Sequence, residues 1–172
     1  MNGAIPGVYI GIVKSNKLDA EGRIEITLEG VSGNAKSYPA RIATLMAGNG
    51  YGTLLLPEKD DQVLVAFING AISEPVVIGG LWSVQDKSPE TNASGENNIK
   101  LIRTRSGNEI RIIDEGGKEL IEIQSPNGKI MIKGSEITLD GSVHITGTLD
   151  VGPDSGSQTH IDGNEITGRT SS

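Results

Sequence analysis

The sequence contains no cysteine among its 172 residues, so neither disulfide bonds nor thiolate metal ligands contribute to its fold. Aromatic residues make up only 3% of the chain, and no stretch approaches the ~20 consecutive apolar residues of a membrane span. Residues 1–6 lack the basic region and apolar run of a signal peptide. No window shows sustained helical periodicity. We therefore expect a soluble, all-β protein that is made in the cytoplasm.

Positive charge is also scarce. The chain has 15 lysines and arginines against 22 aspartates and glutamates, which gives a net charge of −7. An acidic balance argues against nucleic acid as a partner. One basic cluster interrupts it, made of Lys100, Arg103, Arg105 and Arg111. Acidic residues are interspersed with these four, so we interpret the cluster as a solvated outer face and not as a contact with nucleic acid or lipid.

Glycine, in contrast, is abundant, and in the second half of the chain it separates pairs of branched apolar residues. The pairs are Ile110/Ile112, Ile121/Ile123, Ile130/Ile132, Ile137/Leu139, Val143/Ile145 and Leu149/Val151. Residues i and i+2 of a strand share one face, so the members of a pair point the same way. Successive pairs begin 11, 9, 7, 6 and 6 residues apart. This pattern predicts short strands with shortening turns in a long, narrow structure.

A ribbon two apolar residues wide has no interior of its own, because it covers neither its apolar face nor its strand edges. It must either coil on itself as a solenoid or be completed by identical chains. Three copies wound about one axis would close a triangular prism and pair every edge. A solenoid would need a steadier period and more residues. We therefore expect a homotrimeric needle whose core is formed by the twelve paired residues.

The first half of the chain has a different composition. All five aromatic residues lie at or before Trp82, which indicates a globular core that ends there. The run Ile24–Leu28 alternates cleanly, so that Ile24, Ile26 and Leu28 face a core. Short runs of this kind, among them Ser37–Met46 and Tyr51–Leu56, are separated by turn signals and predict a small closed barrel. The expected domains are a barrel over 1–84, a polar linker over 85–98, the needle over 99–151 and a tip or tail over 152–172.

Within the barrel region, several motifs carry a family resemblance, which extends at motif level over most of residues 7–125. The residues that carry it include Arg41, Gly48, Asn49, Gly50, Gly52, Pro57, Glu58 and Trp82. In these motifs the chain resembles the OB-fold domain of phage baseplate assembly protein V and of the VgrG family of tail spikes. The resemblance implies an N-terminal OB-fold barrel followed by an intertwined trimeric triple-stranded β-helix.

The resemblance further implies a structural, non-enzymatic role as the central spike of a contractile phage tail or phage-like injection system. The needle would be driven through the target cell envelope when the sheath contracts. Only about six residues precede the first expected strand, so we expect the baseplate hub to be a separate protein. The expected location is the baseplate centre of a virion or phage-tail-like particle, assembled in the host cytoplasm.

Residues 152–172 break the repeat and leave three alternatives open: a folded tip, a flexible end, or a blunt platform for a PAAR-type tip protein. Some relatives bind an iron on the threefold axis through a His-x-His motif. Here there is a single histidine, His160, in this segment. We interpret it as part of an ordinary polar loop, with a metal ion held by three copies of His160 as the alternative. No other cofactor is expected.

No catalytic constellation stands out. His144 is the middle residue of a repeat strand and is expected on the surface, as are Glu119 and Glu122. The glycines near residue 50 are turn glycines, because no helix follows to bind a phosphate. Two rival functions are a left-handed β-helix acyltransferase, which needs more coils of regular period, and an OB-fold nucleic-acid-binding module, which needs spare aromatics and a basic groove.

Overall fold

The computed structural model describes residues 6–30 and 36–149, and all statements about the fold refer to these residues. In this part of the chain the secondary structure is β-strand, apart from one 3-10 turn, η1 (Ile68–Gly70). No helix in these ranges has the length and apolar character needed to cross a bilayer. The all-β prediction is therefore confirmed for the described residues.

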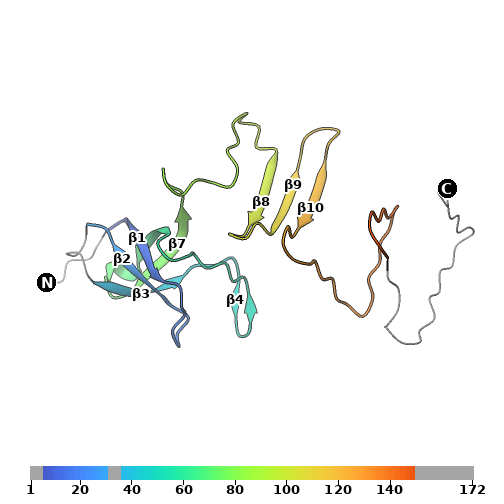
Figure 1. Ribbon diagram of the computed structural model, residues 1–172. Coiled ribbons are helices and arrows are strands. Elements are labelled where there is room, and N and C mark those ends of the chain that lie inside the picture. Colours follow the sequence, from blue (N-terminus) through green and yellow to red (C-terminus); the bar gives the residue numbers. More distant parts are fainter. Residues whose placement is uncertain (1–5, 31–35, 150–172) are drawn as a thin grey trace, which may run out of the picture. The chain divides into compact units, whose positions relative to one another are not determined.

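Five strands of the N-terminal region close into a barrel in the order β1-β2-β3-β7-β6 (Figure 1). They are β1 (Val8–Ser15), β2 (Ile24–Leu28), β3 (Ser37–Ile42), β6 (Gln62–Phe67) and β7 (Pro75–Leu81). Neighbouring strands are antiparallel except β3 and β7, which pair in parallel. Closure removes the exposed strand edges that an open sheet of this size would present. The predicted barrel is present.

The barrel core follows from the alternation of its strands. Ile24 and Ile26 of β2 are fully buried, and Leu28 is nearly so, as the sequence predicts. Val63 and Val65 of β6 belong to the same buried cluster. The inner residues of the strands are branched aliphatics, which suit a half-buried pleated surface. The core therefore depends on aliphatic packing more than on aromatic residues.

Two expected strands are shorter than predicted. The run from Ser37 to Met46 is a strand only as far as Ile42, and the run Tyr51–Leu56 is a strand only at β5 (Tyr51–Gly52). Strand β5 pairs with β4 (Ala47–Gly48) in a hairpin that is separate from the barrel sheet. Residues 53–56 have strand-like composition but take part in no ladder. Composition alone therefore overestimated the strand here, because a strand also needs a partner.

A second sheet follows the barrel in sequence, in the order β10-β9-β8 (Figure 1). Its strands are β8 (Ile99–Arg103), β9 (Glu109–Ile113) and β10 (Leu120–Gln124), all antiparallel. In its register, Ile110 lies opposite both Ile102 and Ile123, and Ile112 lies opposite Ile121. The sheet therefore gathers isoleucines from three strands on one face.

Residues 127–149 contain no assigned strand in the described chain. They belong to a separate unit that begins at Asn127, whereas residues up to Pro126 form one compact unit with the barrel. A strand of the expected β-helix would take its ladder partners from sister chains, which a single chain does not provide. The triple-stranded β-helix, and the domain limits at 84, 98 and 151, therefore remain predictions.

The segment expected as a linker, 85–98, is tied to its surroundings by hydrogen bonds. The hydroxyl of Ser83 accepts a hydrogen bond from the Asp86 N–H at 2.9 Å, and Asn92 Oδ1 accepts one from the Asn97 N–H at 2.7 Å. At its end, the carbonyl of Asn98 accepts a hydrogen bond from the backbone N–H of Asp114, the residue after β9, at 2.8 Å. The segment is polar, as expected, but it has a defined path.

Candidate functional site

The β4–β5 hairpin contains four of the motif residues and depends on their small size. A side chain at Gly48 would collide with the ring of Tyr51, which lies opposite in the ladder. Gly52 has φ +146°, and a side chain there would collide with the carbonyl of Met46. Gly50 has φ +80° in the turn, where glycine costs least. These glycines therefore shape a hairpin.

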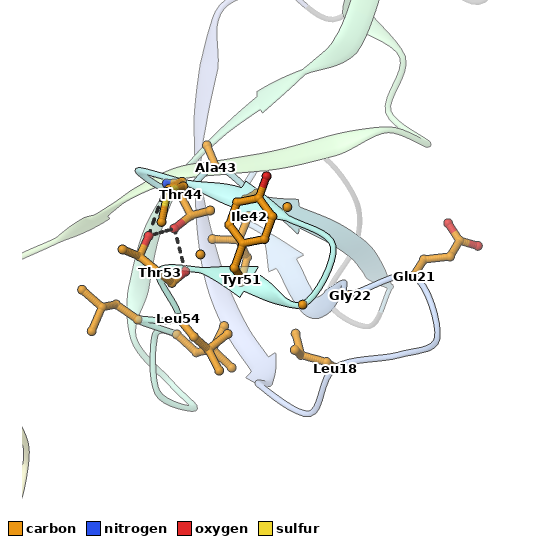
Figure 2. Close-up of a pocket in the computed structure, with 16 residues that line it drawn as sticks. Leu18, Glu21, Gly22, Ile42, Ala43, Thr44, Tyr51, Thr53 and Leu54 are labelled. Atoms are coloured by element: carbon orange, nitrogen blue, oxygen red, sulfur yellow. Dashed lines mark hydrogen bonds between the residues drawn. The ribbon is translucent and has the colours of Figure 1, made fainter. Parts of the chain in front are cut away.

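Two threonines close the base of this hairpin. The Thr44 hydroxyl donates to the carbonyl of Thr53 at 2.9 Å, and the two hydroxyls lie 2.5 Å apart (Figure 2). The Thr53 N–H donates to the Met46 carbonyl at 2.9 Å. Residues 44–53 are thus held as a unit although the ladder itself contains only two residue pairs.

The hairpin and the segment after it border an apolar pocket of about 680 Å³, in which Figure 2 shows Leu18, Ile42, Tyr51 and Leu54. Several apolar side chains around it face solvent in the single chain. The exposed ones are Leu18, Met46, Tyr51, Leu54 and Leu55. Among the described residues that line it, Glu21 is the one acidic group, and there is no basic or histidine side chain. The lining suits an apolar contact and offers no acid–base pair.

The remaining motif residues lie elsewhere. Glu58 accepts a hydrogen bond from Asn16 at 3.2 Å and forms an ion pair with Arg105 at 3.1 Å, while Pro57 precedes it. Arg41 is exposed on β3, and Trp82 is 74% exposed just after β7. The motif residues therefore do not converge on a single site.

The most buried charge in the described chain is the carboxylate of Glu109, whose side chain has no exposed surface. Glu109 Oε1 accepts a hydrogen bond from Arg111 Nε at 2.5 Å, and Oε2 accepts one from Arg103 Nε. Arg111 also approaches Glu90 at 3.9 Å, and Arg103 Nη1 donates to the Pro89 carbonyl at 3.4 Å. Two arginines thus neutralise one buried carboxylate and fasten residues 89 and 90 over it.

These contacts determine the charge state of the carboxylate. The hydrogen bond from Arg111, followed by the one from Arg103, holds the pKa of Glu109 below its ordinary value, although burial acts in the opposite direction. In return, the Glu109 carboxylate raises the pKa of Arg111. Glu109 is therefore ionised at neutral pH and serves as a fixed anchor for the two guanidinium groups. It is not poised for proton transfer.

The opposite face of the same sheet is apolar and exposed. We call it the isoleucine face, and its members are Ile102, Ile110, Ile112, Ile121 and Ile123. Their exposed fractions run from 40% at Ile112 to 71% at Ile121. The charged face, which also holds Ile99, Leu101 and Ile113, is partly covered, whereas the isoleucine face, which also carries Lys100 opposite Ile112, is largely exposed. An exposed apolar face of this size indicates an interaction surface.

The exposed aliphatic residues continue beyond this sheet. The later members of the predicted needle core are at least 47% exposed in the described chain: Ile130, Ile132, Ile137, Leu139, Val143, Ile145 and Leu149. Val151 and His160 lie outside the described residues. The predicted core residues are therefore open to solvent in a single chain, and their common burial remains a prediction.

The basic cluster is neutralised by its neighbours. Lys100 pairs with Asp114 at 2.6 Å, and Arg105 pairs with Glu58. Arg103 and Arg111 both pair with Glu109, so the cluster is not the uniformly solvated face that we expected. Its charges are engaged in ion pairs and do not form a free basic groove. Among residues 6–30 and 36–149, no group of three or more metal-ligating side chains comes together.

Sequence reasoning did not single out Glu109, because an acidic residue at the start of a strand normally faces solvent. Its position opposite Arg103 in the register, two residues before Arg111 on the same strand, is the signal that could have identified it. Ile102 was also left out of the predicted needle core, because its strand lies before the repeating pairs. The register of β8 against β9 adds it to the isoleucine face.

Comparison with known proteins gives matches to part of the chain. Residues 9–82 match the family model of the type VI secretion system/phage-baseplate injector OB domain. The type VI secretion system spike protein VgrG4b of Pseudomonas aeruginosa is 31% identical over 116 residues, which is 62% of this chain and 14% of that protein. The spike protein VgrG3 of Vibrio cholerae is 30% identical over 95 residues, or 52% of this chain and 9% of that protein.

A third relative is the actin cross-linking toxin VgrG1 of Vibrio cholerae, which is 28% identical over 115 residues. The match covers 62% of this chain and 10% of the toxin. The chain therefore spans between 9% and 14% of the length of these three relatives. The similarity covers part of this chain and only a small part of each of these relatives.

Proposed function

We propose that this chain is a structural subunit of a contractile spike, because residues 9–82 match the type VI secretion system/phage-baseplate injector OB domain, as the motif residues predicted. The family is one of baseplate and spike components. Three chains would form the central needle of a phage tail or a related injection system. Chemistry is not part of this role; the chain would transmit force.

One observation carries the proposal: the aliphatic residues after the barrel are exposed in the single chain, from the isoleucine face to Leu149. Leaving so many large aliphatic side chains in water is unfavourable, at roughly 1.5–3 kcal/mol for each that could be fully buried. Three copies around one axis would bury them against one another and pair the open edges of β8 and β10. Burial and edge pairing would be achieved together.

Such a needle is suited to mechanical work. Hydrogen bonds between chains would run along a closed prism with a dry, close-packed aliphatic centre, so that bending would break many contacts at once. The Glu109 anchor supports this role, because it holds residues 89 and 90 against the sheet that begins the needle. The needle would be driven through the target cell envelope when the sheath contracts.

The partners follow from this assignment. The barrel would dock on a baseplate hub protein and fix the threefold axis. The far end of the needle would either form the tip itself or carry a PAAR-type tip protein. The location would be the baseplate centre of a virion or a phage-tail-like particle, which is assembled in the host cytoplasm.

Immunogold labelling of contractile particles from cells that carry this gene tests the proposal. We expect label at the baseplate end of extended particles, and loss of that label when the gene is deleted. Labelling of the major sheath protein along the tail serves as the control for particle integrity. Particles that contract and kill normally without this chain would contradict the proposal.

A further inference from the structure

The exterior of the barrel differs between its two sides. On β2 and β3 the outward residues are polar or short, and we call this side the polar flank: Glu25, Thr27, Ser37, Pro39 and Arg41. Glu25 and Arg41 are exposed there, as is usual for a strand with one solvated face. This side of the barrel requires no partner.

On β1, β6 and β7 most outward residues are aliphatic, with the polar Lys14 and Gln62 at one end, and we call the aliphatic part the aliphatic flank: Val8, Ile10, Ile12, Leu64, Ala66, Val76 and Ile78. The register makes them one patch, because Val8 lies opposite Ala66 and Ile10 lies opposite Leu64. Ala66 in turn lies opposite Val76. These strands are therefore apolar on both faces.

Strands that are apolar on both faces are typical of sheets that are covered on both sides. The inner face of β1, β6 and β7 is covered by the barrel core. The outer face is covered only in part: Val8 is 54% exposed, Ile78 is 44% exposed and Ile10 is 39% exposed, while Ile12, Leu64, Ala66 and Val76 are partly buried. A contiguous aliphatic patch of this kind marks a contact with another protein surface.

We propose that the aliphatic flank packs against a second copy of this chain, so that the three barrels of the spike contact one another with the polar flanks outward. This inference rests on the proposed spike. A ring of three copies gives each barrel an inner and an outer side, which matches the two flanks.

The size of the patch also favours a second copy. A stable interface needs about 800 Å² from each partner, and three exposed aliphatic side chains with four partly buried neighbours are too few to provide it. A sister chain would bring the isoleucine face into the same assembly, so that the two surfaces together reach the required area. An unrelated partner at the flank would have to form its interface from this patch alone.

Cysteine protection tests the inference directly, because the chain has no cysteine of its own. Ile10→Cys places a thiol on the aliphatic flank, and the matched control, Glu25→Cys, places one on the polar flank of the full chain. The readouts are the rate of maleimide labelling and, on the same samples, the mass by light scattering. Both variants are also made in the background of Leu139→Asp, which is expected to separate the chains.

In the assembled trimer, we expect the thiol of Ile10→Cys to label at least ~10-fold more slowly than that of Glu25→Cys, since labelling requires local opening of the contact. In the Leu139→Asp background the two thiols should label at similar rates. Equal labelling rates of the two thiols in an intact trimer would overturn the assignment of the aliphatic flank, but they would not contradict the proposed spike. Protection of the Ile10→Cys thiol in separated chains would also overturn it, because the cover would then belong to the same chain. A wild-type mass of one chain would instead contradict the spike itself.

Discussion

Glu109 Oε1 accepts a hydrogen bond from Arg111 Nε at 2.5 Å, within a sheet whose other face is formed by exposed isoleucines. The ion pair and its cover at residues 89 and 90 occupy the charged face, so the isoleucine face is the one left open. A buried ion pair contributes more to choosing one arrangement than to net stability. Glu109 would therefore determine which face of this sheet stays open for contacts within the needle.

Acid should remove the contribution of Glu109. Because its pKa is lowered in the folded chain, its stabilising effect is complete above the unfolded value, about 4.3, and is lost as the pH falls through the lower folded value. We expect Glu109→Gln to lower the melting temperature at pH 7, and the gap from wild type to shrink below about pH 4.3. Thermal unfolding of both proteins across this pH range provides the measurement.

The matched control for that series is Asp114→Asn, which breaks the ion pair between Asp114 and Lys100. This pair is more exposed than the one formed by Glu109. Surface ion pairs contribute little, about 0–1 kcal/mol, so this variant should stay close to wild type. If Glu109→Gln melted at the wild-type temperature across the whole pH range, Glu109 would not be an anchor.

Gly52→Ala should damage the β4–β5 hairpin. The backbone at Gly52 has φ +146°, and the new methyl group would meet the Met46 carbonyl, which is backbone and has little freedom to move. We expect a loss of about 1–3 kcal/mol in the free energy of unfolding, measured by urea denaturation. Gly22→Ala, at φ +74° and with no atom near the new methyl group, is the control and should cost less. An equal loss of unfolding free energy for the two variants would show that the collision with the Met46 carbonyl does not destabilise the hairpin.

Ile26→Ala tests the barrel core. Ile26 is fully buried between neighbouring strands, so the variant loses apolar burial and leaves a cavity. We expect a loss of about 2–5 kcal/mol in the free energy of unfolding. Leu45→Ala removes a side chain that is 91% exposed and should change it by less than about 0.5 kcal/mol. A larger loss of unfolding free energy for Leu45→Ala than for Ile26→Ala would refute the assigned core.

The predictability of the fold from sequence differed along the chain. Strict alternation at Ile24, Ile26 and Leu28 gave the right inner face, because one strand's burial pattern is local information. The extent of the strand over residues 53–56 was overestimated, because the presence of a ladder partner is not local information. For the needle, pair spacing correctly placed Ile110 and Ile112 on one face with Ile121 and Ile123. Whether sister chains cover that face depends on an assembly that one chain does not contain.

The candidate site was predictable to a smaller extent. Of the motif glycines that were interpreted as turn residues, Gly50 lies in the turn of the hairpin, whereas Gly48 and Gly52 lie in its strands β4 and β5. The Glu109 anchor depends on cross-strand register, which places Arg103 and Arg111 around one carboxylate. The aliphatic flank depends on knowing which face of β1 and β6 points outward. Both are properties of paired strands, so they became visible only once the pairing was known.

Leu139→Asp should prevent the chains from assembling, and Ile132→Asp should do the same. Three carboxylates would meet near the axis in an apolar interior, where unpaired charges are strongly unfavourable. The matched control is Thr138→Asp, since Thr138 lies between the two members of a core pair and is expected to point outward. The readout is the mass of each purified protein. Normal assembly of Leu139→Asp would contradict the buried-axis assignment.

The central claim is that the half of the chain after the barrel obtains its interior from two sister copies. The most direct measurement is the mass of the purified full chain by light scattering at several concentrations. The account predicts a species of three chains, which at 18.0 kDa each amounts to 54 kDa. A well-folded species of 18.0 kDa that persists at every concentration would contradict it.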